Sequence, residues 1–350
     1  MRRTRAWPGM LCLLLAAPMV QADELPAETI RELVRYNTHA AIELYREFLN
    51  QPNDANSPAD IEELVAWMLP RFERRNFETR LLETAGSPLL FARLPNPDAG
   101  VTVLVYLQAD GQPVDRSRWF QDDPYTPVLK ERGADGDWNI IPWHSLDEKI
   151  DPDWRIFARS ASDSKGPMTQ FLIAMDILEQ AGVAPAFDLK VIVDTEEELG
   201  SPNLPDALAR HRDLLAADML VGLVRAHIEK LGFHVVDEEP TEAERQRHAD
   251  IVRFESEISY AAFRSGFDDP PGLLARAGMK NLYGEEPILI RTMGGSIPIA
   301  PFVETLGAPA AIVPTVNMDN NQHSPNENLR LGNFIEGIAV LASVLSRKID

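Results

Sequence analysis

Apolar residues recur every three or four positions in several stretches of the chain, and this spacing predicts α-helices. Residues 26–50 carry it, so we expect one helix or a helix pair there. Ser57 followed by Pro58 is typical of a helix N-cap with proline at the first helical position, which predicts a second helix through about Arg74. The same spacing predicts helices over 168–180 and from about Leu331 to Leu345.

Short apolar runs between these helices predict β-strands. They lie at 77–82, 89–94, 101–107, 187–193, 287–290 and 310–313. The run at 101–107 is almost continuously apolar, as expected of a strand covered on both faces. Alternation of helices and buried strands indicates an α/β fold, a mixed sheet with helices on both faces. Residues 111–155 are rich in Pro, Asp and Trp, and we expect irregular surface structure there.

A different pattern separates the two halves of this α/β region. A helix is predicted over 223–231, ending at Gly232, and a strand over 233–236. Thr241 and Glu244 have the spacing of a capping box, which predicts the start of another helix. We expect this stretch to form a small α+β subdomain inserted between the two halves of the main sheet.

The N-terminus has the pattern of an export signal. Three arginines precede an apolar run from Met10 to Val20, and Val20, Gln21 and Ala22 supply a cleavage site with small residues. The run is too short to span a bilayer, and the alternative is a buried N-terminal helix. We expect cleavage after Ala22 and a protein exported, in the bacterial case, to the periplasm, with no membrane attachment afterwards.

Composition narrows the classes of partner and ligand. The 350 residues carry a net charge of −20, with no basic cluster beyond the first five residues, which argues against a nucleic-acid partner. The single cysteine, Cys12, lies inside the predicted signal segment. A mature chain would therefore have no disulfide, and any metal ion must be bound by His, Asp and Glu.

Acidic and histidine side chains follow several of the predicted strands. Ligands in open α/β sheets bind beyond the carboxyl ends of strands, where we expect Gln108, Asp110, the glutamates at 196–198 and the loop carrying His323. Asp163 precedes the helix predicted to begin near Pro167, a favourable place for a carboxylate. Each has a simpler explanation alone, as a helix cap, a solvated charge run or a surface histidine. Their combination predicts a metal site.

Four strings in this order, D-S-K-G, E-E-L-G-S, G-G-S-I-P and H-S-P-N-E, resemble a known family. It is the di-zinc metallopeptidase and amidohydrolase family of carboxypeptidase G, carnosinase, acetylornithine deacetylase and succinyl-diaminopimelate desuccinylase. The resemblance extends from about residue 30 to 347. It implies a zinc-exopeptidase-like catalytic domain in two parts, 23–221 and 263–350. It also implies that 222–262 is the remainder of a lid and dimerisation subdomain.

The resemblance also implies roles for individual residues. Two divalent ions, zinc or else cobalt or manganese, would be bound in part by Asp163 as the bridging ligand, by Glu198 and by His323. Glu197 would be the general base, and Asp110 would orient an upstream metal ligand. The substrate's carboxylate would be bound by Arg291, Gly294, Gly295 and Ser296.

Two departures from the family pattern bear on activity. Gln108 stands where the family has a histidine ligand, and a neutral amide oxygen binds zinc more weakly than imidazole. After Leu220 the acidic ligand, the lid strands and the lid histidine of the family are absent. Asp218 is the nearest acid that could substitute for the lost ligand, whereas His227 lies mid-helix. The number of bound ions, two or one, is therefore left open.

We expect a metal-dependent hydrolase of amide or peptide bonds in small carboxylate-bearing substrates, such as dipeptides or N-acyl amino acids, impaired by loss of the lid. The alternative is a non-catalytic exported protein that binds a metal ion or a small peptide. A third reading is a shortened chain that folds poorly. Substrate identity and homodimer formation are not determined, because the deleted part carries the family's selective lid and its usual dimer surface.

Overall fold

The computed structural model describes residues 24–215, 234–236, 251–253, 263–291 and 297–348. Its main sheet has four strands in the order β1-β2-β7-β3. Their bounds are β1 (Glu78–Leu82), β2 (Leu89–Leu94), β3 (Thr102–Gln108) and β7 (Asp188–Asp194). β1, β2 and β7 pair antiparallel, and β3 pairs parallel with β7, so the sheet is mixed. The predicted fold class is confirmed.

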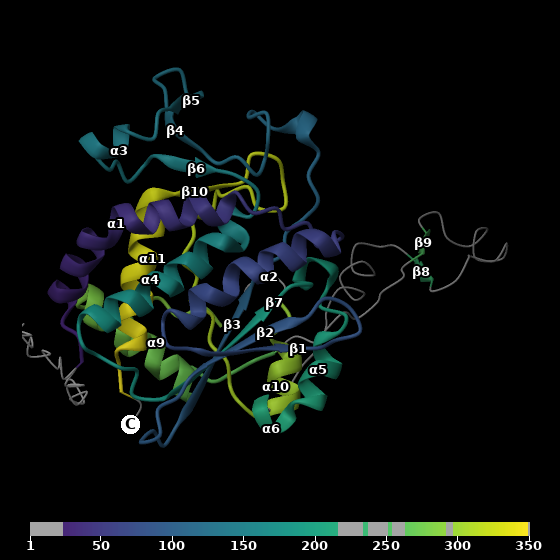
Figure 1. The fold of residues 1–350 in the computed structure, drawn as a ribbon. Helices are drawn as coiled ribbons and strands as arrows, with labels where there is room; N and C mark the ends of the chain where they lie inside the picture. The colour runs from purple at the N-terminus through teal and green to yellow at the C-terminus, as the bar shows by residue number, and fades with distance from the viewer. Residues whose placement is uncertain (1–23, 216–233, 237–250, 254–262, 292–296, 349–350) are drawn as a thin grey trace, which may run out of the picture.

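Helices cover both faces of this sheet (Figure 1). On one face lie α1 (Ala27–Leu49), α2 (Pro58–Glu73), α4 (Gly166–Gln180), α9 (Pro270–Tyr283) and α11 (Leu331–Leu345). On the other lie α5 (Leu204–Arg210), α6 (Arg212–Leu215) and α10 (Ala300–Leu306). No helix in the described ranges is long and apolar enough to cross a membrane.

Alternating side chains of the strands divide the core between these two layers. Leu189, Val191 and Val193 of β7 pack with the first group of helices, whereas Ile192 packs with the second. This period of two follows from the opposite orientation of successive side chains along a strand. The two central strands, β2 and β7, are therefore buried on both faces.

Most predicted elements on the main sheet are confirmed. The first helix is continuous rather than paired, and Ser57 caps α2 by accepting a hydrogen bond from the Asp60 amide. The final helix runs over Leu331–Leu345, as predicted. The prediction that the strand at 101–107 is covered on both sides differs from the structure. β3 is an edge strand within the described residues, and most of its side chains are only half-buried.

The strands predicted at 287–290 and 310–313 are wrong: both segments are irregular in the structure. An apolar run becomes a strand only when a neighbour completes its backbone hydrogen bonds, and neither segment has a ladder partner among the described residues. Ile288, Ile290 and Ile312 are accordingly exposed.

Residues 111–155, predicted to be irregular, instead contribute to a second sheet. It has the order β10-β6-β4-β5, all antiparallel. The strands are β4 (Val128–Arg132), β5 (Trp138–Ile141), β6 (Arg155–Phe157) and β10 (Asn328–Arg330), with the short helix α3 (Ser145–Glu148) beside them. These strands have three to five residues, too short for a clear alternating pattern, and long-range pairing of β6 with β10 stabilises them.

Most of the predicted α+β subdomain lies outside the described residues, including the helices predicted over 223–231 and from Thr241. Two strands are described, β8 (His234–Val236) and β9 (Ile251–Arg253), which pair in parallel. β8 lies within the strand predicted at 233–236. The predicted boundaries at 222 and 262 stay predictions.

Lys130 of β4 is a buried cation, and its charge affects the stability of the second sheet. Its ammonium lies 4.5 Å from the ring centre of Phe157 and 5.0 Å from that of Phe120. Burial lowers the pKa of Lys130 to about 8. A lower pKa in the folded state means that folding disfavours the charged form, so the charge of Lys130 costs stability at neutral pH. That cost disappears as pH rises from about 8 toward 10.5.

We therefore expect Lys130→Met to raise the free energy of unfolding by about 2 kcal/mol near neutral pH, and by much less above about pH 10. Denaturant titrations at the two pH values measure the difference. Lys149→Met, at an exposed lysine, is the control and should change little. Equal destabilisation of Lys130→Met at both pH values would show that the ring contacts outweigh desolvation of the ammonium.

Candidate metal and active site

Two loops of the site leave the main sheet side by side because β3 and β7 are parallel. Gln108 is the register partner of Asp194, and the Ala109 amide donates to the Asp194 carbonyl at 2.9 Å. The carboxyl ends of both strands therefore lie at the same edge. This places the segments 108–110 and 196–198 next to each other, as expected from the sequence.

The other two loops are brought together by the second sheet, in which β6 and β10 lie side by side (Figure 1). β6 leads into the irregular turn 161–165, which carries Asp163, and β10 follows the loop that carries His323. Beyond the strand pair, the Ala158 amide donates to the Glu327 carbonyl at 3.2 Å. The pairing thus continues up to the two loops.

Asp163, Glu198 and His323 converge at this point. His323 Nε2 lies 2.9 Å from Asp163 Oδ2 and 3.3 Å from Glu198 Oε2. One ligand atom from each of the three residues lies within 4.8 Å of the others. Three segments more than 30 residues apart in the chain therefore present a nitrogen and two carboxylates to one small volume.

The glutamates at 196–198 have three different environments. Glu198 faces the cluster, whereas Glu196 accepts hydrogen bonds from the Ser87 amide at 2.9 Å and from Asn203 Nδ2 at 2.7 Å, which anchor the loop. Glu197 is buried, and no hydrogen bond from a described residue reaches its carboxylate. Burial, with the negative charges of Asp163 and Glu198, raises the pKa of Glu197 to about 8.

Asp110 lies behind Glu198. Its Oδ2 accepts a hydrogen bond from the Glu198 amide at 2.9 Å, whereas its buried Oδ1 has no partner among the described residues. Burial raises the pKa of Asp110 to about 8. Its observed contact is therefore with the backbone of a predicted ligand, and its catalytic role stays a prediction.

Three glutamine amides surround the cluster, and two of them were not predicted to take part. Gln322 Nε2 donates to Asp163 Oδ2 at 3.2 Å, and Gln112 Nε2 donates to Glu198 Oε2 at 2.7 Å. Gln108 Nε2 lies 3.5 Å from Asp163 Oδ1. Glutamine carries no charge and fits no metal-ligand pattern, so no sequence signal identified Gln112 or Gln322.

The electrostatics of the cluster favour a cation. Burial and the charge of Asp163 raise the pKa of Glu198, and the hydrogen bond to Asp163 raises the pKa of His323 to about 9. Both pKa shifts show that the acids lie close together with little solvent, and that His323 favours its protonated form because the positive charge balances them. A bound cation would offset the same repulsion.

The donor set fits a divalent metal ion. Zinc binds His nitrogen and carboxylate oxygen at about 2.0–2.2 Å in tetrahedral geometry, which requires donor atoms about 3.3 Å apart. The separations of 2.9 and 3.3 Å from His323 Nε2 are close to this value. Within the described residues this is the one group of three or more such side chains with ligand spacing.

The predicted substrate-binding residues are not joined to this cluster by any described contact. Arg291 is exposed, and its guanidinium lies 4.2 Å from the ring centre of Phe267. Gly294, Gly295 and Ser296 lie outside the described residues. Their role in binding a carboxylate stays a prediction.

Comparison with known proteins places this site in a family context. Among curated proteins, human Beta-Ala-His dipeptidase is 34% identical over 80 residues, 23% of this chain and 16% of that protein. The Cys-Gly metallodipeptidase dug1 of Schizosaccharomyces pombe is 25% identical over 121 residues, 35% of this chain and 21% of that protein. The matches thus span about a fifth of each relative's length.

Solved structures show the same fold at low sequence identity. Human carnosine dipeptidase 1 has a TM-score of 0.65 at 16% identity, covering 92% of this chain and 99% of the other. The dipeptidase Dug1p of Saccharomyces cerevisiae has a TM-score of 0.66 at 14% identity, covering 91% and 98%.

The sequence pattern of Peptidase family M20/M25/M40 matches residues 128–347. That range is well over half of the chain and includes Asp163, Glu197, Glu198 and His323, but begins after Asp110. The fold, the metal-ligand spacing of the cluster and this match lead to one conclusion, that the chain belongs to Peptidase family M20/M25/M40.

Proposed function

We propose that this chain is a metal-dependent hydrolase of peptide or amide bonds in small substrates that carry a carboxylate, such as dipeptides or N-acyl amino acids. The observation that carries the proposal is the convergence of Asp163, Glu198 and His323 beside the buried acid Glu197. Family membership supports it, as do the dipeptidase and metallodipeptidase names of the relatives.

In the hydrolase, Asp163, Glu198 and His323 would contribute ligands to two divalent metal ions. A divalent ion there supplies Lewis-acid polarisation of the substrate carbonyl and lowers the pKa of water. Zinc is proposed because it suits mixed nitrogen and oxygen donors, and cobalt or manganese are alternatives. The glutamines contribute orientation: Gln112 and Gln322 hold the carboxylates of Glu198 and Asp163 through their amide hydrogens.

Glu197 would act as the general base. Its carboxylate accepts no hydrogen bond from the described residues, so it is available to take a proton from the attacking water and pass it to the leaving nitrogen. Burial raises the pKa of Glu197 above that of a free carboxyl, which favours uptake of a proton from water. Asp110, bound to the Glu198 amide, would keep this loop in place.

Substrate selection would come from the second half of the chain. The planar guanidinium of Arg291 is suited to two parallel hydrogen bonds with a carboxylate, and Gly294, Gly295 and Ser296 follow it in sequence. In the structure the Arg291 guanidinium lies over the ring of Phe267.

A second candidate function is binding without hydrolysis, of a metal ion or a small peptide. The observation that favours it is Gln108, whose neutral amide lies beside Asp163 Oδ1, at the side of the carboxylate turned away from His323. A second ion at that side would have a weak ligand instead of imidazole. The number of ions bound per chain separates the two candidates: near two supports hydrolysis, and one supports binding only.

We also propose that the protein is exported and cleaved after Ala22. The segment just beyond this position is part of the fold, because Arg347 at the C-terminal end pairs with Glu24 at 2.5 Å and donates to the Leu25 carbonyl at 2.7 Å. Cleavage at Ala22 would leave these contacts intact.

Metal binding predicts a thermal shift. After chelator treatment and dialysis, zinc at about 100 times its dissociation constant should stabilise the protein by about 2.7 kcal/mol, because it binds the folded state alone. His323→Ala removes the nitrogen ligand and should abolish the shift, whereas His144→Ala, at an exposed histidine on another loop, should keep it. Elemental analysis gives the ions per chain, and a wild type without zinc binding contradicts the proposal.

The role of Glu197 predicts loss of turnover with metal retained. In a screen of dipeptides and N-acyl amino acids with zinc, cobalt or manganese, Glu197→Gln should lower kcat by about 10² to 10⁴, with unchanged zinc content. Glu336→Gln is the matched control, since that glutamate pairs with Arg31 and has no contact with the cluster. Equal activity of Glu197→Gln and wild type would exclude Glu197 as the base.

Export predicts a defined mature mass. Protein expressed from the full sequence in a bacterium should be recovered from the periplasmic fraction, and its mass should correspond to a chain that begins at Asp23. Replacing Val20 and Ala22 by bulky charged residues should block cleavage. A soluble, uncleaved chain in the cytoplasm would contradict this part of the proposal.

A further inference from the structure

Glu327, four residues after His323, is a buried acid to which no role was assigned from the sequence. Its side chain is 1% exposed, yet no metal-ligand contact involves it. It accepts hydrogen bonds from Arg159 and from residues 160, 162 and 163, all on the loop that carries Asp163. The carboxylate of Glu327, on the loop of His323, is thus hydrogen-bonded by the loop of Asp163.

The two oxygens of Glu327 have separate sets of donors. Oε1 accepts from the Ser162 amide at 2.8 Å, from Ser162 Oγ at 2.9 Å and from the Asp163 amide at 2.9 Å. Oε2 accepts from the Ser160 amide and from Arg159 Nη1, both at 2.9 Å. Every partner is a donor, so the site requires an acceptor at both oxygen positions.

These bonds stabilise a backbone conformation that a regular helix or strand would not give. Ser160 has a φ of 59°, in the left-handed region that is unfavourable for a residue with a side chain. The amides of Ser160, Ser162 and Asp163 turn toward one carboxylate as a result. Release of that carboxylate would leave buried amides without partners, which is costly.

The charge of Glu327 is balanced within the same contact. Arg159, 4% exposed, forms an ion pair with it at 2.9 Å. The ion pair therefore offsets much of the negative charge that Glu327 would otherwise add beside the cluster. Because Glu327 follows His323 on the same loop, the distance between Asp163 and His323 depends on this contact.

We propose that Glu327 is a positioning residue, whose buried carboxylate fixes the loop of Asp163 against the loop of His323 and so preorganises the metal ligands. The inference rests on the proposed metal binding. Groups that orient metal ligands typically contribute 10- to 100-fold to metal affinity without contact to the ion.

Glu327→Gln tests this inference because the amide keeps the size of the side chain but puts an NH₂ group where two or more donors point. We expect the zinc affinity, measured by competition with a chelating dye well below the melting temperature, to fall about 10- to 100-fold. Circular dichroism establishes that the variant is folded. A purely structural residue would lower the melting temperature of the metal-free protein and leave the zinc affinity unchanged.

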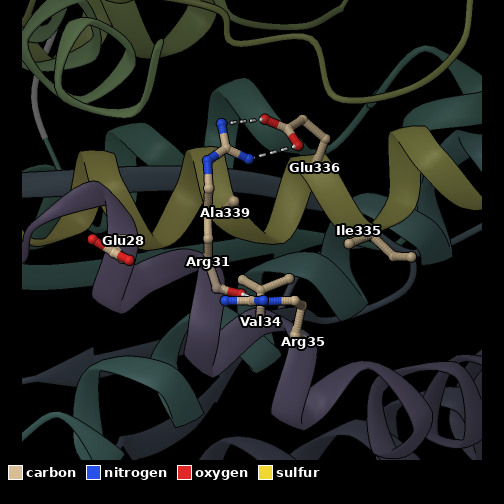
Figure 2. Close-up of a pocket in the computed structure, with 7 residues that line it drawn as sticks. All are labelled: Glu28, Arg31, Val34, Arg35, Ile335, Glu336 and Ala339. Carbon is tan, nitrogen blue, oxygen red and sulfur yellow. Dashed lines mark hydrogen bonds and ion pairs between the residues drawn. The ribbon is translucent and has the colours of Figure 1, made fainter. Parts of the chain in front are cut away.

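Glu336→Gln is the matched control. Glu336 pairs with Arg31 at 3.4 Å in a groove of about 530 Å³ between α1 and α11 (Figure 2), and none of the groove's residues belongs to the candidate site. The same loss of one carboxylate charge there should leave zinc affinity unchanged.

Ser162→Ala provides a second variant if Glu327→Gln does not fold. It removes one donor to Oε1 and keeps every charge, so zinc affinity should fall by a smaller factor, about 3- to 10-fold. Wild-type affinity in both folded variants, or in Ser162→Ala when it alone folds, overturns the role of Glu327 and leaves the proposed function standing. A wild type that binds no zinc overturns both.

Discussion

The antiparallel pairing of β6 with β10 is the contact on which the geometry of the site depends. These strands have three residues each, and they join segments about 170 positions apart. Beyond their last pair, the buried carboxylate of Glu327 continues the connection by binding the amides of the opposite loop. Asp163 and His323 are neighbours because this pairing determines where both loops begin.

The main sheet contributes the third ligand by a different route. Parallel strands end at the same edge, so β3 and β7 deliver Asp110 and Glu198 side by side, and Asp110 binds the Glu198 amide. Two sheets of different construction therefore meet at one cluster. Tyr45 of α1 contacts the turn that carries Asp163, since its hydroxyl donates to the Ala161 carbonyl at 2.6 Å.

The arrangement is electrostatically costly when no cation is present. Asp110 and Glu197 have pKa values near 8 because they are buried among other acids. A site that brings like charges together lowers the stability of the fold. Groups with such shifted pKa values are typical of functional sites. The buried pair of Arg159 and Glu327 lies directly behind the cluster and is already balanced, so the uncompensated negative charge faces the place where a cation would bind.

The periodicity of the sequence determined α1, α2, α4, α11 and the four strands of the main sheet, because burial of one face leaves a regular pattern of apolar residues. It did not identify α9 (Pro270–Tyr283). Residue types and flanking turns indicated a metal site at Asp163, the glutamates at 196–198 and His323, and the family resemblance implied that Glu198 is the ligand among the glutamates. Three features had no such local signal: the short strands β6 and β10, the glutamines around the cluster, and the irregular course of 287–290 and 310–313. The strands and the glutamines depend on partners far away in the chain, whereas the two irregular segments lack a ladder partner among the described residues. Whether a distant segment completes such a contact is decided only by the tertiary structure.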